Sequence, residues 1–421
     1  SSSAAAYRSP LRAACWAAAS TARPGSALGA LERGRGRGYL EVLEDPGAGV
    51  GNLLDCLRRD TRWDWEIDDR AAYHAQLMRE AGVPIDPLLE LLNGPDVYDC
   101  DRAGEVLTEH ALLGSAPARE ALRDYLRHGQ WWQQVLWNPA HRWPEPWWDD
   151  LAPGLVRRLA GERPMFPSFE SWLVRRGLIP AEEGPAGPHR SPETDLGADR
   201  LLAVAADSAL PYAERSAALR ELGRRPEVPV EILPLVAELW ATADDGSTEK
   251  GLMGLRPVLE KLGPLALEPA REWAATDRRW LRWQGLQILA EHGGIGDVPT
   301  VVAYLERQWD ENVWCGPMVL VGHLARFGPR LAETAPLLRA FWRHTPHSCE
   351  RPSYLRALHA IVPEKTAPLL HESLWDCEPD ARLYAVRHAP DSPELALRLA
   401  ELRDSPVEED ELREAAARRL G

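Results

Sequence analysis

Apolar and polar residues follow a helical period along most of the chain, most regularly between Tyr212 and Gly421. The stretch from Asp277 to Gly294 shows it best, because an arginine, a small residue and two leucines are spaced i, i+3, i+4 and i+7 (Arg282, Gly285, Leu286 and Leu289). That spacing places them on one face of an α-helix. Glycines then follow, as they commonly do after the last turn of a helix. The stretch therefore predicts one complete helix.

The frame recurs four more times, with Tyr354 at the small position of one copy and Val or Ala for leucine in two others, so the helix belongs to a repeated unit. The other copies begin at Arg215, Arg351, Arg382 and Arg413, which gives separations of 67, 69, 31 and 31 residues along the five arginines. These separations fit a period of roughly 31 to 35 residues if one degenerate helix lies in each wide interval. Two segments fit these intervals, Lys250–Leu262 and Val313–Phe327, although Pro257 and Pro317 weaken their match.

Each of these helices follows another apolar-periodic segment, so the unit is a helix pair. The preceding segments are Val230–Thr242, Leu265–Thr276, Val298–Trp309, Leu331–His344, Ala367–Trp375 and Glu394–Arg403. No stretch of the chain alternates apolar and polar residues long enough to predict a strand. We therefore expect an all-α protein without a sheet.

The second helix of the pair starts with an acidic residue (Asp277 or Asp380), continues with arginine and then places Ala or Gly before Leu. In this frame the chain resembles HEAT-like repeats of the short bacterial kind, over roughly Asp199–Gly421. The period is shorter than the ~40 to 47 residues usual for HEAT and armadillo arrays, but the motifs of ankyrin and tetratricopeptide repeats are missing. The resemblance implies a right-handed α-solenoid of stacked antiparallel helix pairs, with about seven pairs in residues 196–421.

Composition divides the rest of the chain. Residues 1–38 are rich in Ala, Ser, Gly and Arg and end in GRGRG, which predicts a disordered basic tail; a targeting peptide or a nucleic-acid-binding arm is the alternative. Residues 39–181 carry helical patterns with Gly, Pro and Asn punctuation and predict an irregular N-terminal helical array. Residues 182–195 are rich in Pro and Gly and predict a linker.

Charge and cysteine usage limit the partners. The formal net charge of −15, from 49 basic and 64 acidic residues, disfavours broad binding to nucleic acid or anionic lipid. Six widely spaced cysteines without a CxxC pair indicate neither a metal site nor a disulfide framework, and they favour the cytoplasm. No run reaches the ~18 apolar residues of a membrane span. We expect no cofactor, no metal and no membrane association.

The densest unusual feature is the tryptophan-rich segment, WWQQVLWNPAHRWPEPWW. Exposed tryptophans would anchor a peptide, a sugar or a flipped base. Buried tryptophans would instead fill the space between helices where the prolines at 139, 144 and 146 interrupt a regular helix. The candidate ligand-binding residues are Trp131, Trp132, Trp137, Trp143, Trp147 and Trp148.

Other polar constellations have a structural interpretation beside the functional one. The acidic residues around Trp63 and Trp65 (Asp60, Asp64, Glu66, Asp68 and Asp69) suit either a cation or a helix start. The triplet Asp96, Asp99 and Asp101 lacks the glycine and final Glu of an EF-hand loop. The repeat arginines Arg215, Arg282, Arg382 and Arg413 form either an anion-binding ladder or pairs with acidic residues of neighbouring repeats. We expect His359, His371 and His388 to line repeat interfaces.

No nucleophile elbow, phosphate-binding loop, dinucleotide fingerprint or HExxH motif occurs in the sequence, so no catalytic residue is assigned. The expected function is a non-enzymatic scaffold that binds another protein or a peptide. Two alternatives rest on HEAT-like analogy alone. One is a DNA glycosylase acting on alkylated bases through Trp and a carboxylate, although such an enzyme needs a basic groove. The other is a protein of the bilin-lyase type.

Overall fold

The computed structural model describes residues 22–23, 25–62, 70–160, 167–180, 196–242 and 249–421. These residues form many helices packed against their neighbours, together with one two-stranded hairpin. The chain divides into two compact units, one made of residues 1–183, 339–359 and 363–421 and the other of residues 184–338 and 360–362. We call them unit 1 and unit 2 and describe each by itself.

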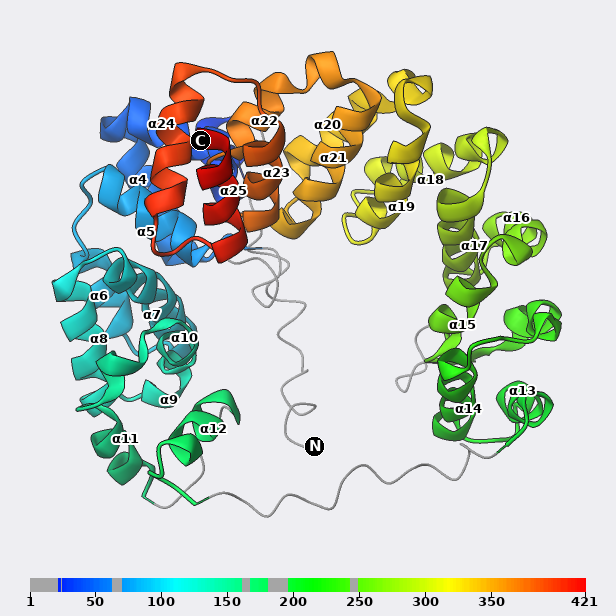
Figure 1. Cartoon of the computed structure of the whole chain (residues 1–421), viewed down its shortest axis with the longest axis horizontal. Coiled ribbons are helices and arrows are strands. Elements are labelled where there is room, and N and C mark those ends of the chain that lie inside the picture. The colour runs from blue at the N-terminus through cyan, green and yellow to red at the C-terminus, as the bar shows by residue number, and fades with distance from the viewer. Residues whose placement is uncertain (1–21, 24, 63–69, 161–166, 181–195, 243–248) are drawn as a thin grey trace. The chain divides into compact units, whose positions relative to one another are not determined.

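The N-terminal part of unit 1 is a series of helices of varied length (Figure 1). In chain order these are α2 (Ala27–Glu32), α3 (Gly36–Glu44), α4 (Pro46–Arg59), α5 (Ala71–Glu80), α6 (Asp86–Leu92), α7 (Val97–Leu112), α8 (Ala116–His128), α9 (Trp132–Val135), α10 (Trp137–Arg142), the 3₁₀ helix η1 (Glu145–Trp148), α11 (Ala152–Leu159) and α12 (Pro167–Arg175). One continuous apolar core runs through them and includes Cys377 from the C-terminal part.

The C-terminal part of unit 1 is more regular. Its elements are η7 (Ser348–Glu350), α21 (Arg351–Ile361), η8 (Pro363–Lys365), α22 (Ala367–Ser373), α23 (Pro379–His388), α24 (Pro393–Asp404) and α25 (Asp410–Leu420). Helix α22 packs on α23, and α25 packs on both α23 and α24. The boundary between the units falls inside α20 (Ala335–His344) and near the end of α21.

Unit 2 also contains helix pairs. Its elements are α13 (Ala198–Ala206), α14 (Tyr212–Arg224), η3 (Val230–Glu238), β1 (Trp240–Thr242), β2 (Glu249–Gly251), α15 (Leu255–Leu262), η4 (Gly263–Ala266), α16 (Leu267–Ala274), α17 (Arg279–His292), η5 (Ile295–Asp297), α18 (Val298–Asp310), α19 (Pro317–Leu324) and η6 (Ala325–Thr334). Helices α13 and α14 form one pair, and α16 and α17 form the next.

The α16–α17 pair shows why the repeat frame holds a small residue. A Cβ atom on Gly285 would lie 2.6 Å from the carbonyl oxygen of Ala270 and 2.6 Å from the backbone nitrogen of Ala274. Only a residue without a side chain lets the two backbones approach this closely. Position i+3 of the frame is therefore the point of closest contact between the two helices of this pair.

The expectation of a protein without any sheet is corrected in unit 2. The segment Val230–Thr242, expected as a helix, is the 3₁₀ helix η3 followed by β1, and Lys250 lies in β2 rather than in a helix. The strands pair antiparallel, with Ala241 opposite Lys250. The helix begins at Leu255, after Gly254, whose φ of +96° is not helical. A Cβ on Gly254 would lie 2.7 Å from the backbone nitrogen of Arg220, so the position requires glycine.

The structure also differs from the predicted tail. Residues 1–21 and 24, and the predicted linker at 182–195, lie outside the described residues. Ser26–Gly38, however, form α2 and the start of α3, and Ala30 and Leu31 are buried. The side chain of Ser26 caps α2 by accepting a hydrogen bond from the amide of Gly29. This part of the expected tail is folded within unit 1.

Within the described part of the chain, no helix combines the length and the apolar character that a membrane crossing needs.

Candidate functional site

The tryptophan-rich segment lies inside unit 1, in α9, α10 and η1. Trp132, Trp143 and Trp148 are buried, whereas Trp131 and Trp147 are partly buried and Trp137 is 42% exposed. Three of the six candidates therefore lie in the core, as the alternative interpretation of the segment has it, and three do not. Trp131, Trp137 and Trp147, which we call the accessible tryptophans, are the ones that reach the surface of unit 1.

The buried tryptophans attach the short helices to α12. Trp143 lies edge-on to Trp147 at 5.4 Å between ring centroids and 5.6 Å from Trp148. Trp148 continues the cluster to Phe169 at 5.6 Å and Trp172 at 5.9 Å. Edge-to-face and tilted contacts of this kind stabilise an apolar core beyond the area that they bury. The cluster orders a segment whose prolines prevent one long helix.

The accessible tryptophans each have a polar or cationic neighbour. The guanidinium of Arg119 lies 5.0 Å from the ring of Trp147, the ring of His141 lies 4.0 Å from that of Trp137, and the indole of Trp131 donates to the carbonyl oxygen of Pro95 at 3.3 Å. Large, rigid aromatic groups held in this way are typical anchors of protein interfaces.

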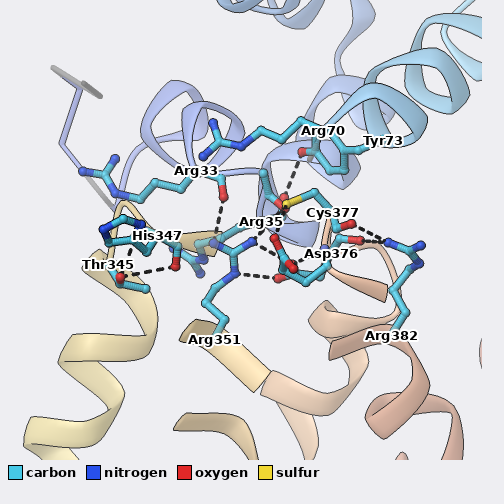
Figure 2. A network of polar contacts seen from close by, with 12 residues as sticks. Arg33, Arg35, Arg70, Tyr73, Thr345, His347, Arg351, Asp376, Cys377 and Arg382 are labelled. Atoms are coloured by element: carbon cyan, nitrogen blue, oxygen red, sulfur yellow. Dashed lines mark hydrogen bonds and ion pairs between the residues drawn. The ribbon is translucent and has the colours of Figure 1, made fainter. Parts of the chain in front are cut away.

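A second constellation in unit 1 was not predicted from the sequence. It is a buried network of arginines, carbonyl groups and carboxylates that joins the N-terminal segment Arg33–Arg35 to α21, α22 and the turn before α23 (Figure 2). The two sides are distant in sequence, since Arg351 and Gly34 are separated by 317 positions. We call it the arginine network.

Arg351 is the centre of the arginine network and is fully buried. Its guanidinium donates to both carboxylate oxygens of Asp376, at 2.8 and 2.7 Å, and to the carbonyl oxygen of Arg33 at 2.8 Å. It also reaches the carbonyl of Gly34 at 3.3 Å. A planar guanidinium suits this role, because its five donors can serve a bidentate carboxylate and backbone carbonyls at once.

Cys377 lies against the same guanidinium. Burial raises the pKa of its thiol although the charge of Arg351 opposes the change, so the thiol is neutral. Its sulfur accepts a hydrogen bond from the Arg351 guanidinium at 3.3 Å. The backbone amide of Cys377 donates a hydrogen bond to the carbonyl oxygen of Gly34 at 2.8 Å. Gly34 has a φ of +66°, and a Cβ there would lie 2.4 Å from the Cys377 sulfur. The glycines of GRGRG therefore allow the backbone to approach, while its arginines supply donors.

Three further arginines extend the network. Arg35 forms an ion pair with Glu372 at 2.7 Å and lies 4.8 Å from the ring of Trp342. Arg33 donates to the carbonyl of His344 at 3.1 Å. Arg70 donates to the carbonyl of Glu32 and, at 3.4 Å, to the carbonyl of Pro346. Because each of these donors meets a partner from a distant segment, the network fixes how the two ends of the chain pack within unit 1.

The repeat arginines differ in their partners. Arg382 pairs with Glu408 at 2.6 Å, as predicted for a ladder between neighbouring repeats. Arg215 donates instead to backbone carbonyls, including that of Ala205 at 2.9 Å, and Arg413 pairs with Asp410 of its own helix. Arg282 has no hydrogen bond or ion pair among the described residues, and its Nε atom is buried without a partner.

The acidic constellations have structural roles where they are described. Burial disfavours the charge of Asp60, but the hydrogen bonds and charge of Arg62 outweigh it and lower the pKa to about 2. Asp96 caps α7 by accepting from the amides of Tyr98 and Asp99, and Asp101 accepts from Gln134 at 3.1 Å. Asp64, Glu66, Asp68 and Asp69 lie outside the described residues.

Two of the histidines, His359 and His388, meet between α21 and α23. His359 of α21 contacts the hydroxyl of Tyr384 in α23 at 3.0 Å, and its ring lies 5.2 Å from that of His388. His371 contacts Trp375 four residues later. Within the described ranges, no three His, Cys, Asp or Glu side chains converge as a metal site would require.

No protein-family model matches the chain, and no curated protein matches it.

Proposed function

We propose that this chain is a non-enzymatic scaffold for protein interactions, built as a right-handed α-solenoid of HEAT-like repeats. The observation that carries the proposal is the succession of helix pairs, of which α13–α14, α16–α17 and α24–α25 have the closest internal packing. A stack of this kind grows by contacts between neighbours and leaves long faces exposed for a partner. The cytoplasmic location expected from the cysteine spacing belongs to the same proposal.

The buried charges of unit 1 support a scaffold. Arg351, Asp376, Arg382 and Glu408 are all buried, and each contacts another group of the chain. An active site usually keeps ionisable groups pointed at a cleft with shifted pKa values matched to a reaction. Here the buried charges hold segments together, which is the role expected in a scaffold.

The partner in this proposal is a protein or a peptide that contacts the accessible tryptophans. Trp147 is the best anchor, because its ring is held by Trp143 on one side and by Arg119 on another, so little side-chain entropy is lost on binding. Truncating such an anchor commonly costs about 2 kcal/mol or more of binding free energy. That loss corresponds to roughly a 25-fold weaker complex.

The test starts with the full chain, immobilised and exposed to an extract of its native cell. A partner identified in this way is then purified and titrated against wild type, Trp147→Ala and Trp314→Ala, the last being a partly buried tryptophan of unit 2. We expect the first variant to weaken the complex roughly 25-fold and the second to leave it unchanged. Thermal melting of each variant controls for folding.

Equal binding by wild type and Trp147→Ala would overturn the assignment of the anchor. Duplex DNA at low salt is included as a second ligand. Tight, steeply salt-dependent binding to DNA would favour the glycosylase alternative over the scaffold.

A further inference from the structure

A hollow in unit 2 lies between α16, α17 and α18 and has a volume of about 170 Å³. Its lining residues are Ala274, Leu286, Thr300, Ala303, Tyr304 and Arg307. The last four are spaced i, i+3, i+4 and i+7 along α18, so one face of that helix forms a wall. The hollow exists because this face carries short side chains, Thr300 and Ala303, opposite the short Ala274.

The volume suits one side chain. Liquid water occupies about 30 Å³ per molecule, so the space equals that of roughly six waters. The methyl groups of Ala274, Ala303 and Leu286 offer an apolar wall, while Tyr304 and Arg307 offer a hydroxyl and a cation. A ligand group with a short aliphatic stem and an acidic end fits both parts of this lining.

Positive charge gathers around Tyr304. The Arg307 guanidinium lies 5.2 Å from the centre of its ring, and Trp283 lies 6.1 Å from it on another side. Arg279 and Arg282 also act on the Tyr304 hydroxyl, whose pKa burial raises despite these cations, with Glu311 as an acidic neighbour. In a chain with a net charge of −15, this concentration of cations is a local exception.

One of these arginines, Arg282, has no hydrogen bond or ion pair inside the described part of the chain. Arg215 and Arg382, which hold the same place in their repeats, donate to carbonyls and to Glu408. Arg282 has no such acceptor, and its Nε is buried without a hydrogen bond. Arg282 does not line the hollow, but its charge and that of Arg279 act on Tyr304 and favour an anionic group beside that residue.

We propose that the hollow between α16, α17 and α18 is a binding site for the acidic side chain of a partner protein, most simply a glutamate within an acidic segment. The glutamate methylenes lie against Ala303 and Leu286, and the carboxylate accepts hydrogen bonds from Tyr304 and Arg307. This site deepens the proposed scaffold function and rests on it, since it names the chemistry of a partner segment. It is separate from the accessible tryptophans, which belong to unit 1.

An acidic peptide fits better than nucleic acid. Binding to a phosphate backbone draws on many cations along a face, whereas here Arg307 lines a single hollow with an apolar wall, and Arg279 and Arg282 act on its Tyr304. The overall negative charge further opposes a polyanion as long as a nucleic acid.

The experiment uses the full chain and a fluorescein-labelled octaglutamate peptide, with fluorescence anisotropy as the readout. Arg307→Glu reverses the charge at the hollow, and Ala303→Phe fills the hollow without changing the charge. Both positions are exposed, so both variants should fold. Arg200→Glu is the matched control, because Arg200 is an exposed arginine in α13 of the same unit. We expect at least tenfold weaker binding for the first two variants and less than a twofold change for the control.

The proposal is overturned if wild type does not bind the peptide, or if Ala303→Phe binds it fully with an unchanged melting temperature. It is equally overturned if Arg200→Glu loses as much binding as the other two variants. Tighter binding of a single-stranded oligonucleotide, with the same response to the variants, would overturn it as well. Competition by inorganic phosphate as strong as that by unlabelled peptide would assign the hollow to a free anion and would also overturn it. If the peptide fails while a partner still binds in a Trp147-dependent manner, only this inference fails and the scaffold function stands.

Discussion

At the scale of single residues, Gly34 has a conformation and a neighbour that exclude a side chain. Replacing it with alanine forces a left-handed backbone onto a residue with a Cβ, which costs roughly 1–2 kcal/mol, and pushes that Cβ toward the Cys377 sulfur. Overpacking of a dense core typically adds about 1–3 kcal/mol. We expect Gly34→Ala to lower the free energy of unfolding of unit 1 by about 2–5 kcal/mol, measured by urea denaturation.

Gly51→Ala is the matched control for this prediction. Gly51 lies in the middle of α4, and nothing lies within 4 Å of the place where its Cβ would be. Alanine should stabilise that helix by about 0.5–1 kcal/mol. If both glycine variants have the same sign of effect, the close contact at Gly34 does not contribute to stability.

His74 makes the stability of unit 1 depend on pH. Burial, reinforced by the positive charges of Arg70, Arg62 and Arg102 and opposed by Asp60, lowers the pKa of its imidazole to about 3. In the unfolded chain the pKa is near 6.5. Below pH 6.5 the unfolded state therefore binds a proton that the folded state does not bind, so stability falls as the pH drops from 6.5 toward 3.

The variant His74→Gln should lose this part of the pH dependence. Between pH 6 and pH 5, wild type should lose about 1 kcal/mol more unfolding free energy than the variant does. His128→Gln is the control, because the side chain of His128 is 71% exposed. Parallel curves for wild type and His74→Gln would mean that folding does not change the pKa of this imidazole.

Individual residues also show what the sequence could and could not predict. The i+3 glycine at Gly285 was identifiable because the repeat supplies five copies of its frame. GRGRG occurs once, so its composition indicated disorder, and its contacts come from residues more than 300 positions away. Tyr39 and Val42, which follow GRGRG within α3, are buried.

At the scale of elements, α2 and the start of α3 should stabilise unit 1. Deleting residues 1–38 removes the Arg33 and Gly34 carbonyls that Arg351 contacts, together with the Arg35–Glu372 ion pair. A buried guanidinium that loses its acceptors costs a few kcal/mol. We expect the melting temperature of unit 1 to fall by roughly 5 °C or more, measured by differential scanning calorimetry.

Deletion of residues 1–21 is the comparison, because it leaves every contact of the arginine network in place. Its melting temperature should match that of the full chain. Equal melting temperatures for both deletions would restore the interpretation of all 38 residues as a tail that contributes nothing to stability.

Elements with strong periodicity were predicted well, and elements set by special backbone conformations were not. Helices α17, α21, α23 and α25 lie where the frame places them. The predicted helix over Val313–Phe327 is restricted to Pro317–Leu324 in the structure, preceded by Gly316 with a φ of +108°. Such a φ depends on local contacts, here with the Trp283 ring, and periodicity carries no information about them.

At the scale of the whole molecule, the arginine network places N-terminal and C-terminal segments in one compact unit, with the residues of unit 2 between them in the sequence. A linear repeat array would predict contacts only between successive units. The sequence therefore could indicate the helix pairs, but it could not indicate that Gly34 meets Cys377 or that Arg142 donates to the carbonyl of Val407. Neither contact is encoded by a local pattern.

The same connection predicts how the chain behaves when it is cut. A specific protease site inserted between residues 187 and 188, in the predicted linker, allows the intact chain to fold before cleavage into fragments 1–187 and 188–421. Because the arginine network and the shared apolar core hold 1–187 to the C-terminal helices, the fragments should elute together in gel filtration under native conditions.

Arg351→Leu should make the two fragments separate. It leaves Asp376 buried without its partner, and breaking a buried ion pair costs about 3–5 kcal/mol. Arg356→Ala is the control, since its ion pair with Asp380 is solvent-exposed and contributes about 1 kcal/mol at most. Separation of the wild-type fragments directly after cleavage would show that these contacts do not hold unit 1 together.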